Sequence, residues 1–103
     1  MTDLTSKQRA QLRGIANSID TILHVGKDGI GANLIKQADD ALEAREIIKG
    51  RVLENCLLSP REAAETLAEA TRSQVVQVIG TKFVLYRETH SKEKDKRIKL
   101  VEA

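Results

Sequence analysis

The four residues Gly26-Lys27-Asp28-Gly29 are the part of this sequence best suited to hold a ligand. Two glycines around two residues permit a tight turn and let an extended molecule approach the backbone closely. Lys27 places a cation at the tip of that turn, where it can meet a phosphate. An ordinary glycine-rich turn with a solvated lysine has the same composition, so the prediction depends on what surrounds the loop.

The helix expected after this loop, at about residues 32–44, strengthens the prediction. Residues 31–34 contain no acidic side chain, whereas the last expected helix has Ser59 and Glu62 to cap its own first turn. A helix start without such caps offers free amides and the positive end of a dipole to an anion. Asp28 opposes a phosphate unless its carboxylate turns away or accepts hydrogen bonds from the turn's own amides.

Five further cations lie on neighbouring elements. Arg9 and Arg13 are one turn apart on the first expected helix, Lys49 and Arg51 alternate along one side of a strand, and Lys36 is on the helix after the loop. By position alone each is equally a solvated charge or part of a binding surface. The predicted binding residues are therefore Gly26, Lys27, Asp28, Gly29, Arg9, Arg13, Lys49, Arg51 and Lys36.

Four other reactive or charged residues are expected to be structural. Lys82 and Arg87 flank the last expected strand and read as charges that protect a sheet edge. His24 is expected to be a partly buried strand residue, although a histidine there could also donate to a phosphate. Cys56 has no second ligand or catalytic partner nearby in the sequence and is expected to be a buried thiol.

Known nucleotide-binding motifs do not fit the glycine loop. A P-loop needs four residues between its glycines, and only two separate Gly26 from Gly29. The spacing does match the Gly-x-x-Gly loop with which KH-type domains hold a nucleic-acid backbone. Phe83 and Tyr86 are the only aromatic residues, which argues against base stacking and favours recognition of backbone and shape.

No nucleophile–base pair, carboxylate dyad or metal-ligand set stands out in the sequence. We therefore expect a protein that is not an enzyme, with no cofactor, no metal and no small-molecule substrate. The single cysteine, the lack of a signal peptide and the lack of a long apolar run predict a cytoplasmic protein without a membrane partner.

The elements that position the loop follow from hydrophobic periodicity and turn residues. Thr5 with Gln8, and Ser59 with Glu62, predict two capping boxes, and the two residues at 80–81 predict a hairpin. Helices are expected at about 6–18, 32–44 and 59–72, and strands at about 21–25, 46–53, 74–79 and 82–87. The order α-β-α-β-α-β-β predicts an α/β fold, a two-layer sandwich with a mixed four-stranded sheet.

One domain at residues 1–90 and a charged tail at 91–103 are expected. The tail contains five basic and three acidic residues, and this excess of two positive charges equals the net charge of +2 of the whole chain. A binding surface on the body must therefore come from segregation of acids and bases. The three apolar residues of the tail, Ile98, Leu100 and Val101, leave a docked segment open as the alternative to a mobile tail.

Several short motifs together resemble the YhbY family of bacterial proteins, single-domain members of the CRM class (chloroplast RNA splicing and ribosome maturation). The resemblance covers about residues 4–87. It rests on the segments Leu4-Thr5-x-Lys7-Gln8-Arg9-x-x-Leu12-Arg13, Val25-Gly26-Lys27-x-Gly29, Glu46-Ile47-Ile48-Lys49, Val78-Ile79-Gly80 and Leu85-Tyr86-Arg87.

This resemblance implies a fold similar to the C-terminal domain of bacterial translation initiation factor three. It also implies RNA binding through the Gly-x-x-Gly loop and its basic surroundings, and association with precursors of the large ribosomal subunit. The expected partner is therefore ribosomal RNA, bound by a monomer without catalysis. The alternatives are an adaptor that docks on ribosomal or assembly proteins without touching RNA, and a small enzyme that binds a nucleotide phosphate in the loop.

Overall fold

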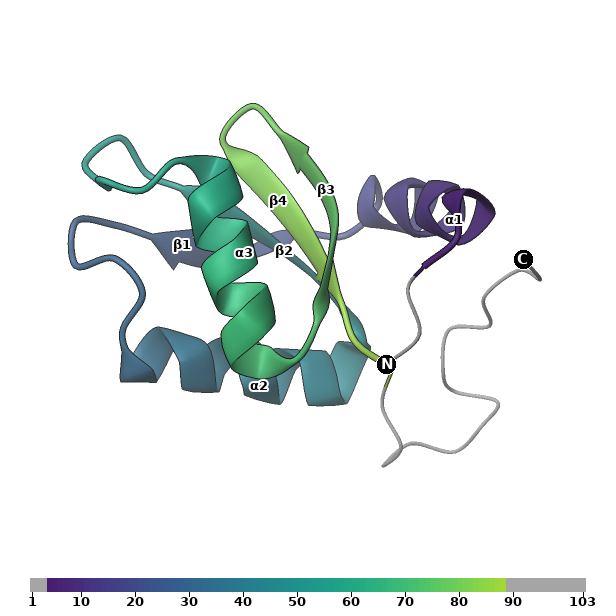
Figure 1. Cartoon of the computed structure of the whole chain (residues 1–103), viewed down its shortest axis with the longest axis horizontal. Helices are drawn as coiled ribbons and strands as arrows, with labels where there is room; N and C mark the ends of the chain where they lie inside the picture. The colour runs from purple at the N-terminus through teal and green to yellow at the C-terminus, as the bar shows by residue number, and fades with distance from the viewer. Residues whose placement is uncertain (1–3, 89–103) are drawn as a thin grey trace.

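A computed structural model describes residues 4–88, which form three helices and four strands (Figure 1). All elements agree with the predicted types and order, and their ends differ from the predicted ones by at most two residues. The predicted boundary at residue 90 and the charged tail lie outside the described residues. In chain order the elements are α1 (Ser6–Ala16), β1 (Thr21–Val25), α2 (Ala32–Arg45), β2 (Ile47–Val52), α3 (Pro60–Thr71), β3 (Gln74–Ile79) and β4 (Lys82–Tyr86).

The strands form one sheet in the order β1-β2-β4-β3. β1 runs parallel to β2, while β4 pairs antiparallel with both β2 and β3. The predicted α/β fold with a mixed four-stranded sheet is therefore confirmed. Because β4 is an interior strand, Lys82 at its start and Arg87 just after its end do not protect an edge, and that prediction was wrong.

The helices divide unequally between the two faces of the sheet. Along β4, Phe83 and Leu85 join the core formed with α2 and α3, whereas Val84 and Tyr86 join a smaller core under α1. Successive side chains of a strand point to opposite faces, so α1 lies across the sheet from the other two helices. The predicted two-layer sandwich describes the sheet with α2 and α3, and α1 partly covers the second face, as Figure 1 shows at one end of the sheet.

Local sequence explains where α1 and α3 begin. The Thr5 hydroxyl accepts from the Gln8 amide and the Gln8 side chain accepts from the Thr5 amide, at 3.2 and 3.1 Å. Ser59 and Glu62 make the same reciprocal pair at the start of α3. The hydrogen bonds from Ser59 lower the pKa of the Glu62 carboxyl below its ordinary value of 4.5, because they favour the ionised form. Both predicted capping boxes are confirmed.

Gly50 marks a close approach between the middle strands. It pairs with Phe83 across β2 and β4, and a Cβ atom at this position would overlap the Phe83 ring. The sheet's two irregularities lie elsewhere, between Thr21 and Leu23 and between Val75 and Gln77. This close approach, and not a bulge, accounts for a glycine at this position.

Cys56 lies in the loop between β2 and α3, and it is half-buried rather than buried as predicted. Its sulfur accepts from the Leu58 amide at 3.4 Å, and its side chain packs against the larger core. The next residue of this loop, Leu57, is almost completely exposed.

Candidate nucleic-acid interface

The Gly26–Gly29 loop is a closed turn at the end of β1. The Gly29 amide donates to the Gly26 carbonyl at 3.0 Å, and Gly29 adopts a φ of +67°, which glycine tolerates without strain. Lys27 and Asp28 occupy the exposed tip of the turn. Within residues 4–88 the Lys27 ammonium forms no ion pair, so it is available to an external anion.

The start of α2 is open next to this turn. Gly31 is the N-cap residue, no side chain caps the helix, and the first turn contains no acidic residue. A hollow of about 320 Å³ adjoins the helix start and is lined by Asp28, Gly29, Gly31, Ala32, Asn33 and Leu34. The Asp28 carboxylate is exposed and, within the described part of the chain, accepts no hydrogen bond from the amides of the turn. The exposed helix start therefore has the character expected of an anion site, with one carboxylate at its rim.

A row of basic side chains crosses the sheet at the same end. His24 of β1 pairs with Arg51 of β2, which pairs with Lys82 of β4. Residues directly opposite each other across neighbouring strands have Cβ atoms about 4.5–5.5 Å apart on one face. We call His24, Arg51 and Lys82 the basic row; all three are exposed, and among residues 4–88 none of them forms an ion pair.

The prediction that His24 is partly buried was wrong, because its strand leaves this side uncovered. Leu23 and Val25, its neighbours on β1, point into the larger core, so His24 points to the other face. α1 covers that face only at the far end of the sheet. The uncovered part of this face carries the basic row, Lys49 and the strand residues that pair with Lys49. We call it the open face.

Lys49 lies one step further along the open face than Arg51. It is half-buried, pairs with Val84, and its ammonium donates to the Ala16 carbonyl at the end of α1 at 3.1 Å. One of its three protons is thus used to hold the helix end, and two remain for a ligand. Lys49 and Arg51 lie on the same face, as the sequence pattern predicted.

The three remaining predicted cations, Arg9, Arg13 and Lys36, differ in their exposure and in their partners. Arg9 is half-buried, and its Nη1 donates to the Val75 carbonyl at 2.5 Å, which ties α1 to β3. Arg13 is exposed in the last turn of α1. Lys36 forms an ion pair with Asp40 at 3.3 Å on α2, behind the sheet. The structure therefore places Arg51 at the same end of the sheet as the loop, and Lys49 on the same face but further from the loop, opposite Thr21 at the start of β1. It does not bring Lys36 to them.

Acidic residues gather on the opposite layer of the molecule. Asp39, Asp40 and Glu43 are exposed on α2, and the exposed acids of α3 lie on that layer as well. No acidic residue lies within β1, β2, β3 or β4. The charged residues of the strands are therefore all basic, whereas α2 and α3 carry basic residues such as Lys36 and Arg61 among their acids.

His24 and Lys82 are the members of the basic row that sequence reasoning did not include. Each stands in a strand where alternation predicts its face, but the row depends on the pairing of β1 with β2 and of β2 with β4. That pairing joins residues far apart in the sequence, and nothing local specifies it.

Among residues 4–88, no group of three or more histidine, cysteine or acidic side chains is placed to hold a metal ion. No helix in this part of the chain combines the length and the apolar character needed to cross a bilayer.

Comparison with known families decides the assignment. The model of the CRS1/YhbY (CRM) domain matches residues 4–87, which is nearly the whole described part. The chain belongs to the CRS1/YhbY (CRM) domain family. The predicted resemblance is therefore confirmed, and the matched range contains the loop, the basic row and all seven elements of this CRM domain.

Relatives of this CRM domain extend over most of its length. It is 50% identical over 97 residues to the Probable RNA-binding protein YqeI of Bacillus subtilis, covering 94% of this chain and 98% of that one. It is 37% identical over 86 residues to a Methanocaldococcus jannaschii protein that is also named a probable RNA-binding protein, covering 82% and 63% of the two chains. A solution structure of a Staphylococcus aureus hypothetical protein, described as an RNA-binding candidate, is similar with a TM-score of 0.77 and 54% identity, covering 96% of this chain and 100% of that one.

Proposed function

We propose that this CRM domain binds structured RNA through its phosphate backbone, and that its target is ribosomal RNA in precursors of the large ribosomal subunit. In this proposal the protein positions or protects RNA during assembly and catalyses no reaction. The names of its relatives support RNA as the partner. The ribosomal target is what the family resemblance implies.

The observation that carries the proposal is a set of basic side chains at one end of the sheet that form no ion pair within residues 4–88. Lys27 lies in the turn after β1, and the basic row begins at His24, three residues before it. A ligand must be long and polyanionic to meet a turn, a helix start and a row across three strands together. An RNA backbone has these properties, and its affinity for such a surface depends on neutralised phosphates.

A charge-matched pair of variants tests this proposal. Lys27→Gln removes a cation from the loop, while Arg45→Gln removes one from the exposed end of α2 on the acidic layer. Each phosphate contact contributes about 0.7–0.9 to the slope of log affinity against log salt. We expect Lys27→Gln to weaken binding of a hairpin RNA by about 3–10-fold and to reduce this slope by about one. Arg45→Gln should leave both unchanged.

The ribosomal part of the proposal needs a separate experiment. We expect the protein to sediment with particles close to the large subunit when a lysate of its own host is fractionated on a sucrose gradient. Ribonuclease treatment should move it to the top fractions. If the protein stays with those particles after ribonuclease and at high salt, the adaptor function replaces direct RNA binding.

A further inference from the structure

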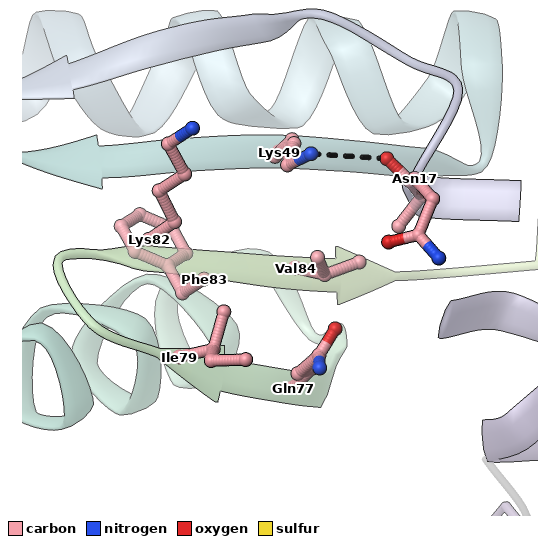
Figure 2. Close-up of a pocket in the computed structure, with 8 residues that line it drawn as sticks. Asn17, Lys49, Gln77, Ile79, Lys82, Phe83 and Val84 are labelled. Atoms are coloured by element: carbon pink, nitrogen blue, oxygen red, sulfur yellow. Dashed lines mark hydrogen bonds between the residues drawn. The ribbon is translucent and has the colours of Figure 1, made fainter. Parts of the chain in front are cut away.

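Besides the hollow at the start of α2, the molecule has another one on the open face, between the end of α1 and the β3–β4 hairpin (Figure 2). Two rows of paired residues form it: Lys49, Val84 and Gln77 in one, and Lys82 and Ile79 in the other. Asn17, the C-cap residue of α1, borders it where the helix stops. The hollow measures about 220 Å³, below the roughly 300–1,000 Å³ of pockets that enclose drug-sized molecules. Only a small group, such as a single ring system, fits it.

The lining combines apolar, amide and cationic groups in separate places. Val84 is buried at the centre, and the side chain of Ile79 is 64% exposed beside it. Figure 2 shows the amides of Asn17 and Gln77 near Val84, one from α1 and one from β3. Amide side chains both donate and accept hydrogen bonds, and within residues 4–88 these two have no hydrogen-bonding partner.

Cations stand at the rim of this hollow. Lys82 belongs to the basic row, and Lys49 keeps two protons free beyond its bond to Ala16. No carboxylate lines the hollow. A flat group with an apolar face and a polar edge, attached to a phosphate, matches this arrangement, and an unpaired nucleotide has that chemistry.

We propose that this hollow receives the base of one unpaired RNA nucleotide, while the phosphates on either side lie on Lys49, Lys82 and Arg51. The inference rests on the proposed function, because the basic row that would guide the strand is the same. The base packs on Ile79 and Val84, since both aromatic rings of the chain, Phe83 and Tyr86, are buried. The Asn17 and Gln77 amides meet its edge.

A hollow that receives one base selects for a particular class of RNA. A duplex presents its phosphates to the loop and the basic row, but its paired bases cannot enter a hollow in the sheet. An unpaired nucleotide beside a duplex satisfies both sites together. The preferred ligand is therefore a helix that adjoins a loop, bulge or single-stranded end.

The test compares two synthetic RNAs, a blunt duplex and the same duplex with a short unpaired extension, by fluorescence anisotropy. The wild-type protein should bind the extended RNA about 10-fold tighter, because the base buries apolar surface on Ile79 and Val84 and hydrogen-bonds with the two amides. Gln77→Ala and Ile79→Ser should abolish this preference and leave the affinity for the blunt duplex unchanged. Lys27→Gln should weaken the binding of both RNAs.

Leu57→Ser is the matched control for Ile79→Ser. Both change an exposed aliphatic residue to serine, and Leu57 lies in the β2–α3 loop, away from the hollow. Removal of the bases from the extension, with its sugar–phosphate chain kept, should also abolish the preference. Equal affinity of the wild-type protein for both RNAs, or a full preference in the Ile79→Ser and Gln77→Ala variants, overturns the inference while backbone binding stands. Failure to bind either RNA overturns the proposed function itself.

Discussion

Arg87 and Asp39 join the end of β4 to the middle of α2: Nη1 of the arginine lies 2.6 Å from Oδ1 of the aspartate. The same guanidinium also donates to the Thr71 carbonyl at the end of α3 and to the Glu43 carboxylate. The Arg87 side chain is only 15% exposed, so these bonds form where water competes weakly. One side chain therefore holds both helices of the larger core to the sheet.

Arg87→Ala should lower the free energy of unfolding by about 2 kcal/mol, because it removes several charge-assisted hydrogen bonds and leaves the Thr71 carbonyl without its donor. Urea unfolding followed by circular dichroism measures the loss. Arg61→Ala is the control, since the Arg61–Glu65 pair is exposed on α3 and such pairs contribute less than about 1 kcal/mol. Equal losses in the two variants would contradict this role of Arg87.

Gly50→Ala should destabilise the protein by about 1–3 kcal/mol, because the new methyl group must displace the Phe83 ring in a packed core. Gly14→Ala should instead raise the stability of the protein. Gly14 is exposed inside α1 with open space around its Cα, so alanine there should stabilise the helix by about 0.5–1 kcal/mol. Thermal unfolding of both variants checks the signs. A neutral Gly50→Ala would show that the Phe83 ring can move aside without cost.

Arg51 and Lys82 of the basic row should each contribute to RNA affinity. We expect Arg51→Gln and Lys82→Gln each to weaken binding of a blunt duplex by about 3–10-fold and to lower the salt dependence by about one phosphate contact. Because Arg51 and Lys82 pair directly across β2 and β4, the double variant measures the coupling between the two losses in free energy. Arg45→Gln again serves as the charge-matched control. Salt slopes identical to that of the wild-type protein would remove the row from the interface.

The Ser59–Glu62 cap should make part of the stability depend on pH. The folded state lowers the pKa of Glu62 below 4.5, so the stabilisation is present above the ordinary pKa and is lost as pH falls through the folded pKa. Glu62→Gln should therefore be less stable than the wild-type protein at neutral pH, and the difference should shrink in acid. Gln8→Ala removes the equivalent residue of the α1 cap, which contains no ionisable group, so its deficit should not follow this pH dependence. Urea midpoints measured across the acid range test both.

Much of this fold could be predicted from short stretches of the sequence. The capping pairs Thr5–Gln8 and Ser59–Glu62 lie three residues apart, and the turn at 80–81 joins adjacent strands, so their outcome depends on short stretches of sequence. The uncapped start of α2 follows from the composition of a single turn. Family resemblance supported the same architecture from motifs spread along the chain.

The remaining features depend on contacts between distant residues. Arg9 donates to Val75, and Arg87 to Asp39, across separations of 66 and 48 residues. The exposure of His24 follows from where α1 stops on the second face of the sheet. Periodicity identifies which residues share a face of one element, but it does not identify the partner element. For this reason the binding surface was predicted at the loop and left incomplete across the sheet.

The small core under α1 has a consequence for how the molecule opens. Six buried residues form that cluster, whereas twelve form the cluster shared by α2, α3 and the sheet in the described part of the chain. Segments with less buried apolar surface separate at a lower free-energy cost than the whole protein does. Amide hydrogens of α1 should therefore exchange with solvent earlier than those of α3, through an excursion in which α1 lifts off and the rest stays folded. Such an excursion uncovers the remainder of the second face, next to the residues that we assign to RNA.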